Sequence, residues 1–544
     1  MKKYLFVFNK TLSPLLLIII TLIGIFFRLE NISPFKVYPD SYQSLIVALN
    51  IINYHSVLGY LGSNGMVYPD FFSWTHPGYP LIIDAVTIIT HNMTLSARSI
   101  AFVAGILTIP LAYFFIKRVF SSNACGLAGS LFIACSFNHT VWGGFLMTET
   151  TGVFFTMLFL WYLFTVVKTK NSLFHWRDII LGLLFFLMVI TRYEYIILLV
   201  PVLFFLLLNK YPLKRSIIFL FIFLLLCVLI VELLFPLPST FTIIMYQLQA
   251  ILIRVWILIS SFLVLSTAIY FSPRTIKNFA VNYGHVVIVF LFIILLILLR
   301  NFFAHEILVD IFSVIGFFLM LKKKETRIIG YFSLIACTCL LSIYYYINPE
   351  MERYVTHLLP FLIIPASYGL IKTYKIVSSK SKRQQYIFYG IISFLIFLQA
   401  VMTTVGLKSS QDPSWYQISY EDKAAEMTKK YIPNHDYLLI TSYPEPYYYH
   451  LHISTQSIAD TYPYIFIDTV QSNQKILIIE DMGMHDDFPH FTNFLDKNLS
   501  KNKIASFWVN KKFQYVATVQ EEKYPVVIYK ITLKELEAKI KLER

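Results

Sequence analysis

Apolar runs about as long as a lipid bilayer is thick recur through most of this 544-residue chain. A helix needs roughly 20 consecutive apolar residues to cross a bilayer, and its backbone polar groups must then pair within the segment. The runs therefore predict helices that span a membrane. Hydrophobic residues make up 57% of the sequence and charged residues 14%, which excludes an ordinary soluble protein and favours a polytopic α-helical membrane protein.

Basic residues between the apolar runs predict the direction in which each helix crosses. Lys2, Lys3 and Lys10 precede a first helix at 12–27, so we expect the N-terminus in the cytoplasm. The run 79–90 is short for a span, and if it lies in the membrane interface, every later cluster of Lys and Arg falls on the cytoplasmic side. This interpretation gives about 13 spans and places the tail outside. The later spans are expected near 98–116, 124–138, 145–166, 178–191, 194–209, 216–235, 247–270, 285–300, 305–321, 327–347, 354–371 and 385–406.

The sequence changes character along its length and so divides into two domains. We expect residues 1–407 to form the membrane domain, with a first outer loop at 28–80, and residues 408–544 to form a soluble extracytoplasmic α/β domain. In the loop, 41–58 has apolar residues at helical spacing, which suits a helix in the membrane interface. The tail alternates strand-like runs with helical patterns and has no glycine loop that would bind phosphate. Its strand-like runs are DYLLIT, QKILIIED, FQYVATV and YPVVIYKI, and its helical patterns lie at 419–431 and 488–499.

Net charge and cysteine usage exclude other classes of protein. The net charge of +14 is scattered over short loops between spans, where it sets the topology, so we expect no nucleic-acid partner. The five cysteines lie in or beside apolar runs and show no zinc spacing. The sequence therefore predicts no disulfide framework and no metal site, and nothing in it requires a cofactor.

The first outer loop carries the best candidates for chemistry. It is long compared with most loops in compact domains, and it contains Asp40 and Asp70, each at the end of a Val-Tyr-Pro-Asp tetrapeptide. An acidic residue at the outer rim of a helix bundle can act as a general base on a hydroxyl group. Asp40 follows the first helix closely, which holds it at this rim. The alternative is that Asp40 only caps the helix that starts at Ser41.

Arginines on the predicted outer side are unexpected, because basic residues are favoured on the cytoplasmic side. They therefore indicate a bound anion. A guanidinium group binds phosphate through two parallel hydrogen bonds, so a lipid phosphate is the expected ligand. The alternative is that these side chains extend toward lipid headgroups. Glu149 and Glu194 lie on the same face, where each either lines the pocket or pairs with an arginine. The outward arginines are Arg28, Arg98, Arg192, Arg300 and Arg353.

Short motifs follow one another on the predicted outer face, namely Asp40 in Pro-Asp-Ser-Tyr-Gln, then His76–Tyr79, Thr191–Glu194 and Arg353–Pro360. Together they resemble motifs of the GT-C superfamily of polyprenyl-phosphate-sugar glycosyltransferases, in its protein O-mannosyltransferase, aminoarabinose transferase and RgtA/B/C/D-like branch. The corresponding family patterns are Asp-Glu-x-x-Tyr, His-Pro-Pro-Leu, Thr-Arg-x-Glu and Arg-Tyr-x-x-x-x-x-Pro. The second acid of the first pattern is Ser41 here, which departs from the family. The resemblance covers residues 1 to about 410.

The resemblance implies a multi-pass glycosyltransferase of the plasma membrane. It would move a sugar from a polyprenyl-phosphate donor to an extracytoplasmic acceptor, which is a protein, a lipid or a glycan. It also implies inversion by direct displacement, with Asp40 as the general base. Because Ser41 carries no carboxylate, Asp70 becomes the candidate for a second one. Some relatives bind a divalent metal, although nothing in this sequence requires one.

The same resemblance implies binding roles for further residues. Positive charge is expected around the donor phosphate, where it would stabilise the charge that develops as the phosphate leaves. The candidates for that phosphate are Arg353, Arg192 and Arg98, and the candidates for the acceptor or sugar pocket are Tyr42, His76, Glu149 and Glu194.

Two other functions compete with this interpretation. A transporter or flippase for lipid-linked sugars would place polar groups near the bilayer midplane, usually in broken helices of repeated halves. In this sequence the charges lie at the rim and the spans show no repeat. An inactive relative that serves as a scaffold, with the tail as its binding module, is the other alternative, and the intact Asp40 argues against it.

The predicted topology is testable by labelling whole cells. In a Ser472→Cys variant, we expect the new thiol to react with an impermeant maleimide from outside, because an odd number of spans places the tail there. Lys323→Cys serves as the control and should react only after lysis. Labelling of position 472 only after lysis would contradict the topology.

Overall fold

The computed structural model shows a largely helical protein. Within the described residues, helices long and apolar enough to cross a membrane lie at Leu12–Glu30, Met93–Phe120, Thr148–Lys168 and Lys382–Thr404. Two expected spans, 247–270 and 285–300, lie outside the described residues, so the count of about 13 stays a prediction. The described residues are 2–30, 39–54, 76–168, 176–234, 306–347, 356–379, 381–410, 418–432, 437–442, 444–451, 455–457, 475–481, 484, 489–515, 518–532, 534–536 and 538–539.

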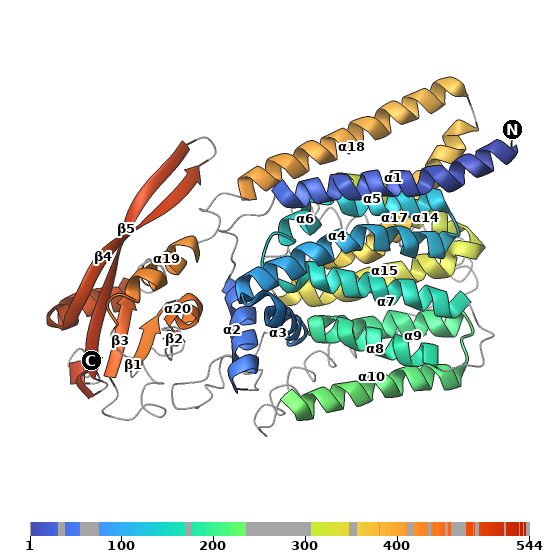
Figure 1. Ribbon diagram of the computed structural model, residues 1–544. Helices are drawn as coiled ribbons and strands as arrows, with labels where there is room; N and C mark the ends of the chain where they lie inside the picture. Colours follow the sequence, from blue (N-terminus) through green and yellow to red (C-terminus); the bar gives the residue numbers. More distant parts are fainter. Residues whose placement is uncertain are drawn as a thin grey trace, which may run out of the picture. The chain divides into compact units, whose positions relative to one another are not determined.

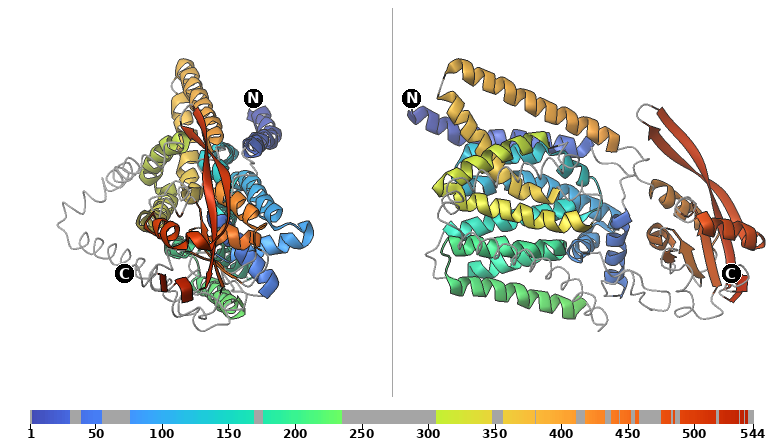
Figure 2. Two further views of the ribbon diagram at one scale, coloured as in Figure 1. Left: turned by 90° about the vertical axis from the view of Figure 1, so that its left-hand side faces the viewer. Right: turned by 180° about the vertical axis from the view of Figure 1, so that it is seen from behind.

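The chain forms two compact units, and the first comprises Met1–Ile32 and Arg98–Lys408. Most of its helices run side by side as a bundle (Figure 1, Figure 2). Apolar side chains cover its outward faces, since Ile18 is 56% exposed, Phe221 62% and Phe394 61%. Exposed apolar surface of this kind marks contact with lipid or with another apolar surface. The helices are α1 (Lys2–Glu30), α4 (Met93–Phe120), α5 (Asn123–Cys135), α6 (Phe137–Trp142), α7 (Thr148–Lys168), α8 (Trp176–Thr191), η2 (Tyr193–Leu198), α9 (Leu199–Leu208), α10 (Leu213–Leu234), α14 (Ile307–Lys322), α15 (Lys324–Ile347), η3 (Thr356–Leu358), α17 (Leu359–Ser378) and α18 (Lys382–Ser410).

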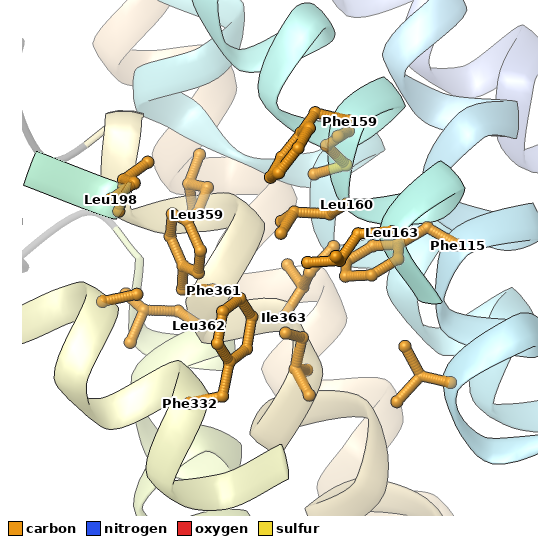
Figure 3. Close-up of a cluster of buried hydrophobic side chains, with 14 of the residues drawn as sticks. Phe115, Phe159, Leu160, Leu163, Leu198, Phe332, Leu359, Phe361, Leu362 and Ile363 are labelled. Carbon is orange, nitrogen blue, oxygen red and sulfur yellow. The ribbon is translucent and has the colours of Figure 1, made fainter. Parts of the chain in front are cut away.

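Aromatic rings hold the centre of this bundle together (Figure 3). Phe115 of α4 lies 5.8 Å from Phe164 of α7 between ring centroids, and Phe164 lies 5.9 Å from Phe332 of α15. Phe332 in turn lies 6.1 Å from Phe361 of α17. These separations fall in the range of favourable aromatic pairs. Because lipid is as apolar as these side chains, the fit between them, more than the exclusion of water, stabilises the bundle.

Helices α14 and α17 touch through glycines. A Cβ atom on Gly316 would lie 1.8 Å from the backbone oxygen of Pro365, and one on Gly369 would lie 2.3 Å from the backbone oxygen of Phe312. The two backbones therefore pack at a distance that admits no side chain at either position. Small residues that let helix backbones approach are typical of helix pairs in membranes.

A buried ion pair joins α8 to α10. Arg215 Nε lies 2.7 Å from Asp178 Oδ2, and Arg215 Nη2 donates to Asp178 Oδ1 at 3.1 Å. The hydroxyl of Tyr211 also donates to Asp178 Oδ1. With both partners buried and further donors present, the geometry is of the kind that a buried ion pair needs to offset its loss of hydration.

The second unit comprises Ser33–Ala97 and Ser409–Arg544, so it joins a segment near the N-terminus to the tail. Its sheet has five strands in the order β2-β1-β3-β5-β4. β1 is parallel to β2 and β3, whereas β5 runs antiparallel to β3 and β4. The elements are α2 (Pro39–Tyr54), α3 (Gly78–Thr90), α19 (Ile418–Thr428), β1 (Tyr437–Thr441), α20 (Pro444–Leu451), β2 (Thr455–Ser457), β3 (Lys475–Glu480), α24 (Pro489–Leu499), η5 (Ser500–Asn502), β4 (Lys503–Tyr515) and β5 (Thr518–Thr532).

The central strands bury both of their faces. Tyr437 and Leu439 of β1 belong to a core cluster that includes residues of α19 and α20. Leu438 and Ile440 point the other way, into a cluster that includes Phe491 of α24. Strands that are covered on both faces have nearly continuous apolar sequences, which explains the run Tyr-Leu-Leu-Ile in β1.

A buried carboxylate connects the sheet to α20. Asp481, directly after β3, accepts hydrogen bonds from Thr441 Oγ1 at 3.0 Å, Ser442 Oγ at 2.6 Å and Tyr447 Oη at 3.1 Å. The backbone N–H of Met484 is a further donor at 3.1 Å. Burial raises the pKa of Asp481, and these hydrogen bonds act in the opposite direction. Since Tyr447 belongs to α20, the network fixes α20 to the ends of β1 and β3.

Helices lie at the expected positions that the structure describes, including α2 over most of 41–58, but the expected span 124–138 is divided at Ser136 between α5 and α6. One predicted strand is wrong. The run FQYVATV is divided, because its first residues end β4 and its last residues begin β5. The sequence prediction missed the full length of β4 and β5, because the ends of both strands next to their connection are largely polar. In the register, Lys511 lies opposite Glu522 and Lys512 opposite Glu521.

We predict that the glycine contact tolerates no methyl group. Gly369→Ala should lower the thermal unfolding temperature of the purified protein, because backbone atoms of α14 occupy the space and overpacking costs about 1–3 kcal/mol or more. The matched control is Gly390→Ala on α18, where nothing lies within 4 Å of the added carbon. The control should be neutral or stabilising, because alanine favours helix by about 1 kcal/mol over glycine. Equal unfolding temperatures for Gly369→Ala and wild type would contradict the close contact.

Candidate functional site

Helix α2 carries the predicted base Asp40 in its first turn. α2 begins at Pro39, and proline is favoured in the first turn because its missing N–H would be unpaired there. Asp40 comes next, where the helix dipole stabilises a carboxylate. The side chain of Asp40 and the residues Asp70, Arg300 and Arg353 lie outside the described part of the structure. Their predicted roles stay predictions.

The tail packs directly on α2. Tyr42, one turn of helix from its start, is 3% exposed, and its ring centroid lies 5.5 Å from that of Tyr449 and 6.3 Å from that of His450. The hydroxyl groups of Tyr449 and Thr94 are 2.9 Å apart. Tyr449 of α20 therefore joins α2 to the start of α4, within the second unit. Tyr42, which the sequence assigns to the sugar or acceptor pocket, contacts the tail here.

Helix α3 follows the His76 motif and packs on α2. His76 is partly buried, and Pro77 directly precedes the helix. The hydroxyl of Tyr79 donates to the backbone oxygen of Ala97 at 2.9 Å, and Thr87 Oγ1 donates to Ser96 Oγ at 3.0 Å. These bonds hold α3 against the first turns of α4. The motif that contains His76 thus starts a helix that supports α2.

Arg192 lies between two carboxylates in the first unit. Its Nη1 donates to Glu149 Oε1 at 2.9 Å, and its Nη2 donates to Glu194 Oε1 at 3.2 Å. Nη1 also donates to Thr148 Oγ1 at 3.1 Å. Arg192 is 4% exposed and Glu149 fully buried. The pairing that the sequence left open for Glu149 and Glu194 is present. In this arrangement Arg192 faces carboxylates, and its predicted role toward a donor phosphate stays a prediction.

The described part of the last predicted motif, residues 356–360 of Arg353–Pro360, is also buried. Thr356 and His357 of η3 have no exposed surface, and His357 Nδ1 lies 2.5 Å from the hydroxyl of Tyr195. Tyr195 follows Glu194 directly and belongs to η2. The hydrogen bond therefore connects the Thr191–Glu194 motif with the segment that follows Arg353 and Tyr354. Arg98 lies in the first turns of α4 and is partly buried.

A second buried polar cluster, which we name the polar junction, consists of Arg28, Ser136, Asn138, His139 and Glu306. Nη2 of Arg28 lies 2.6 Å from His139 Nδ1, and the backbone N–H of His139 donates to Ser136 Oγ at 3.2 Å. Ser136 Oγ donates to Glu306 Oε1 at 2.6 Å, and the N–H of Asn138 donates to the same oxygen at 2.9 Å. The chain of bonds runs from α1 through the turn between α5 and α6 to the start of α14.

Sequence reasoning identified Arg28 in this cluster but missed His139 and Glu306 as its neighbours. The run Ser-Phe-Asn-His-Thr between two apolar helices is the signal that points to a polar turn there. Ser136 ends α5 and caps α6, a position for which serine is strongly favoured. Arg28 and Glu306 meet this turn from helices far away in sequence, and no local pattern reveals that.

Within the residues that the structure describes, no group of three or more His, Cys, Asp and Glu side chains is arranged to hold a metal ion. The described side chains therefore do not form a zinc or magnesium site by themselves. Each of the described cysteines is a free thiol.

A family model of dolichyl-phosphate-mannose-protein mannosyltransferases matches residues 75–235 of the chain. The match begins just before His76 and includes Arg98, Glu149, Arg192 and Glu194. Among curated proteins, no sequence matches the chain.

Solved structures match over nearly the whole chain. An oligosaccharyltransferase of Archaeoglobus fulgidus, tethered to an acceptor peptide with the NVT sequon, is 13% identical with a TM-score of 0.58, covering 95% of this chain and 74% of that chain. AglB, an oligosaccharyltransferase from the same organism in complex with an inhibitory peptide and a dolichol-phosphate, is 12% identical with a TM-score of 0.53, covering 95% of this chain and 74% of that chain. The first oligosaccharyltransferase, in a complex with Zn and sulfate, is 13% identical with a TM-score of 0.57, covering 93% of this chain and 72% of that chain.

A second protein matches over nearly its whole length. ArnT from Cupriavidus metallidurans in the apo state is 10% identical with a TM-score of 0.51, and the match covers 95% of this chain and 98% of that chain. At such low identity the likeness concerns the fold. It confirms the resemblance predicted from the motifs and the predicted class, a helical membrane protein with a C-terminal α/β region. The chain has the fold that this oligosaccharyltransferase and ArnT share.

Proposed function

We propose that the protein is a membrane glycosyltransferase that moves a sugar from a polyprenyl-phosphate donor to an acceptor outside the cytoplasm. The observation that carries the proposal is the placement of Asp40. Asp40 lies in the first turn of a helix that follows α1 and is held by α3 and α20. The fold is that of an oligosaccharyltransferase solved with dolichol-phosphate and of ArnT. A lipid phosphate is thus a ligand that this fold accommodates in a similar protein.

The proposed reaction is a direct displacement with inversion. The acceptor oxygen forms a bond to the anomeric carbon of the sugar while the bond from that carbon to the phosphate oxygen breaks. Asp40 takes the proton of the acceptor hydroxyl, and the electron pair of the broken bond leaves with the polyprenyl phosphate. Base catalysis of this kind contributes about 10²–10⁴ in rate.

The leaving phosphate gains negative charge and needs cations or hydrogen-bond donors around it. We assign this role to Arg98 and Arg353, with Arg192 as the third candidate. Arg192 has its charge offset by Glu149 and Glu194. For this reason we expect the triad of Arg192, Glu149 and Glu194 to act mainly by holding α7 and η2 in place. Tyr42 and His76 remain the candidates for the sugar or acceptor pocket, and Asp70 remains the candidate for a second carboxylate.

The similar oligosaccharyltransferase was solved with Zn and sulfate. The described side chains of this chain hold no cluster that would bind such an ion. We therefore derive no step of the proposed reaction through a metal.

The role of Asp40 is testable by an isosteric change. The Asp40→Asn variant should fold normally, because asparagine also suits a helix start. Its transfer rate should be lower than that of wild type by a factor of about 10²–10⁴. Membranes with the variant are assayed with radiolabelled sugars on polyprenyl phosphate, for a panel of sugars. Asp70→Asn is the companion variant, and comparable loss there would indicate that Asp70 supplies the second carboxylate. Asp40→Asn with more than about a tenth of the wild-type rate would remove Asp40 from the role of base.

The contact between the tail and α2 gives a second test. Tyr449→Ala removes the ring beside Tyr42 and the hydroxyl beside Thr94, so α2 should lose part of its support. We expect the turnover number to fall several-fold while the KM for the lipid-linked donor changes little. The control is Ile504→Ala, which alters a side chain of β4 that is 47% exposed. An unchanged turnover number in Tyr449→Ala would show that α2 does not depend on this contact.

A further inference from the structure

Among the described carboxylates that are at most 9% exposed, each has a hydrogen-bond donor beside it except that of Asp84. Neither oxygen of Asp84 has a partner, although the residue is only 9% exposed. Buried polar groups are rarely left in this state, and each case calls for an explanation. The buried carboxylates with donors are Glu149 with Arg192, Asp178 with Arg215, Glu306 with Ser136, Glu480 with Tyr529 and Asp481 with Ser442.

Asp84 lies on the inward side of α3. The buried residues of this helix are Gly78, Tyr79, Pro80, Ile83 and Asp84. On the outward side, Ile88 is 75% exposed and Ile89 is 79% exposed, as expected for a helix that lies against lipid. α3 is too short to span the bilayer, and it packs on α2, whose first turn holds Asp40. The carboxylate therefore lies inside the second unit, on the helix that supports α2.

The fold gains nothing from this carboxylate. Burying a charge or a polar group without a partner costs free energy, and burial raises the pKa of Asp84 to about 7. A leucine or an asparagine would fill a similar volume at lower cost. Groups that lower stability in this way are typical of functional sites, where a ligand supplies the missing partner.

We propose that Asp84 is a substrate-binding residue that accepts a hydrogen bond from a hydroxyl group of the lipid-linked sugar. The proposal rests on the proposed function. A carboxylate accepts hydrogen bonds and repels phosphate, so the sugar and not the phosphate is its ligand. The lipid anchor holds the donor sugar at the membrane interface. A short helix with exposed isoleucines on its outward side, such as α3, suits that interface. A soluble acceptor has no such tether, which favours the donor.

Binding measurements test this without turnover. Purified full-length protein is titrated with undecaprenyl phosphate and with undecaprenyl phosphate that carries mannose, glucose or aminoarabinose. For the sugar that wild type binds best, we divide the Kd of undecaprenyl phosphate by the Kd of the sugar-bearing lipid. This ratio reports recognition of the sugar alone. Asp84→Leu should lower this ratio about tenfold to hundredfold, the loss expected for a hydrogen bond to a charged group. Asp84→Asn, which keeps one acceptor oxygen, should lose less.

The controls separate a binding role from a structural one. Ile88→Ala alters the outward side of α3, where the side chain is 75% exposed, and it should keep the wild-type ratio. Asp84→Leu should unfold at the wild-type temperature or above it. An unchanged ratio in Asp84→Leu, or a lower unfolding temperature in both Asp84 variants, would overturn the proposal. If wild type itself binds no sugar lipid more tightly than undecaprenyl phosphate, the proposed function falls, and this proposal falls with it.

Discussion

The absence of water inside a bilayer is the constraint on which the membrane unit depends. Helices that end or start there must find partners for their terminal backbone groups within the protein. The polar junction meets this need between α5, α6 and α14. Ser136 caps one helix and binds Glu306, while Gln399 Nε2 and Thr403 Oγ1 of α18 donate to the backbone oxygen of Cys135 at 3.3 and 3.0 Å. Gln399 Oε1 also accepts from the N–H of Leu308. Helices from four parts of the sequence are thereby fixed around one turn.

Buried polar groups also need partners in the second unit. Its sheet is covered by helices on both faces, so its central strands have the apolar sequences of a buried sheet. Polar side chains are concentrated at the strand ends, where Asp481 connects β1 and β3 to α20. α20 then presents Tyr449 and His450 to α2. The position of the candidate base is thus set by contacts that begin in the tail.

The sequence predicted much of this architecture because its signals are local. Hydropathy located the helices, and the spacing of apolar residues located α2. The ion pairs of Arg192 were foreseen as an alternative, because Glu149 and Glu194 share a predicted membrane face. Non-local features escaped prediction. The contact of Gly316 with Pro365, the arrival of Glu306 at Ser136 and the partnerless state of Asp84 all depend on which helices meet. The full length of β4 was not predicted for another reason. The second half of this strand is largely polar, so it shows no alternation of apolar residues.

The composition of the second unit has a consequence for the order in which the protein is made. α2 and α3 leave the ribosome early, whereas α20, which packs on α2, leaves it after the membrane helices. Proteins are synthesised from the N-terminus, and early domains fold first. Tyr42 of α2 therefore lacks the rings of Tyr449 and His450 until α20 has been made. Completion of the second unit is in this way tied to the synthesis of α20, so a product that ends before α20 would lack the contacts that hold α2.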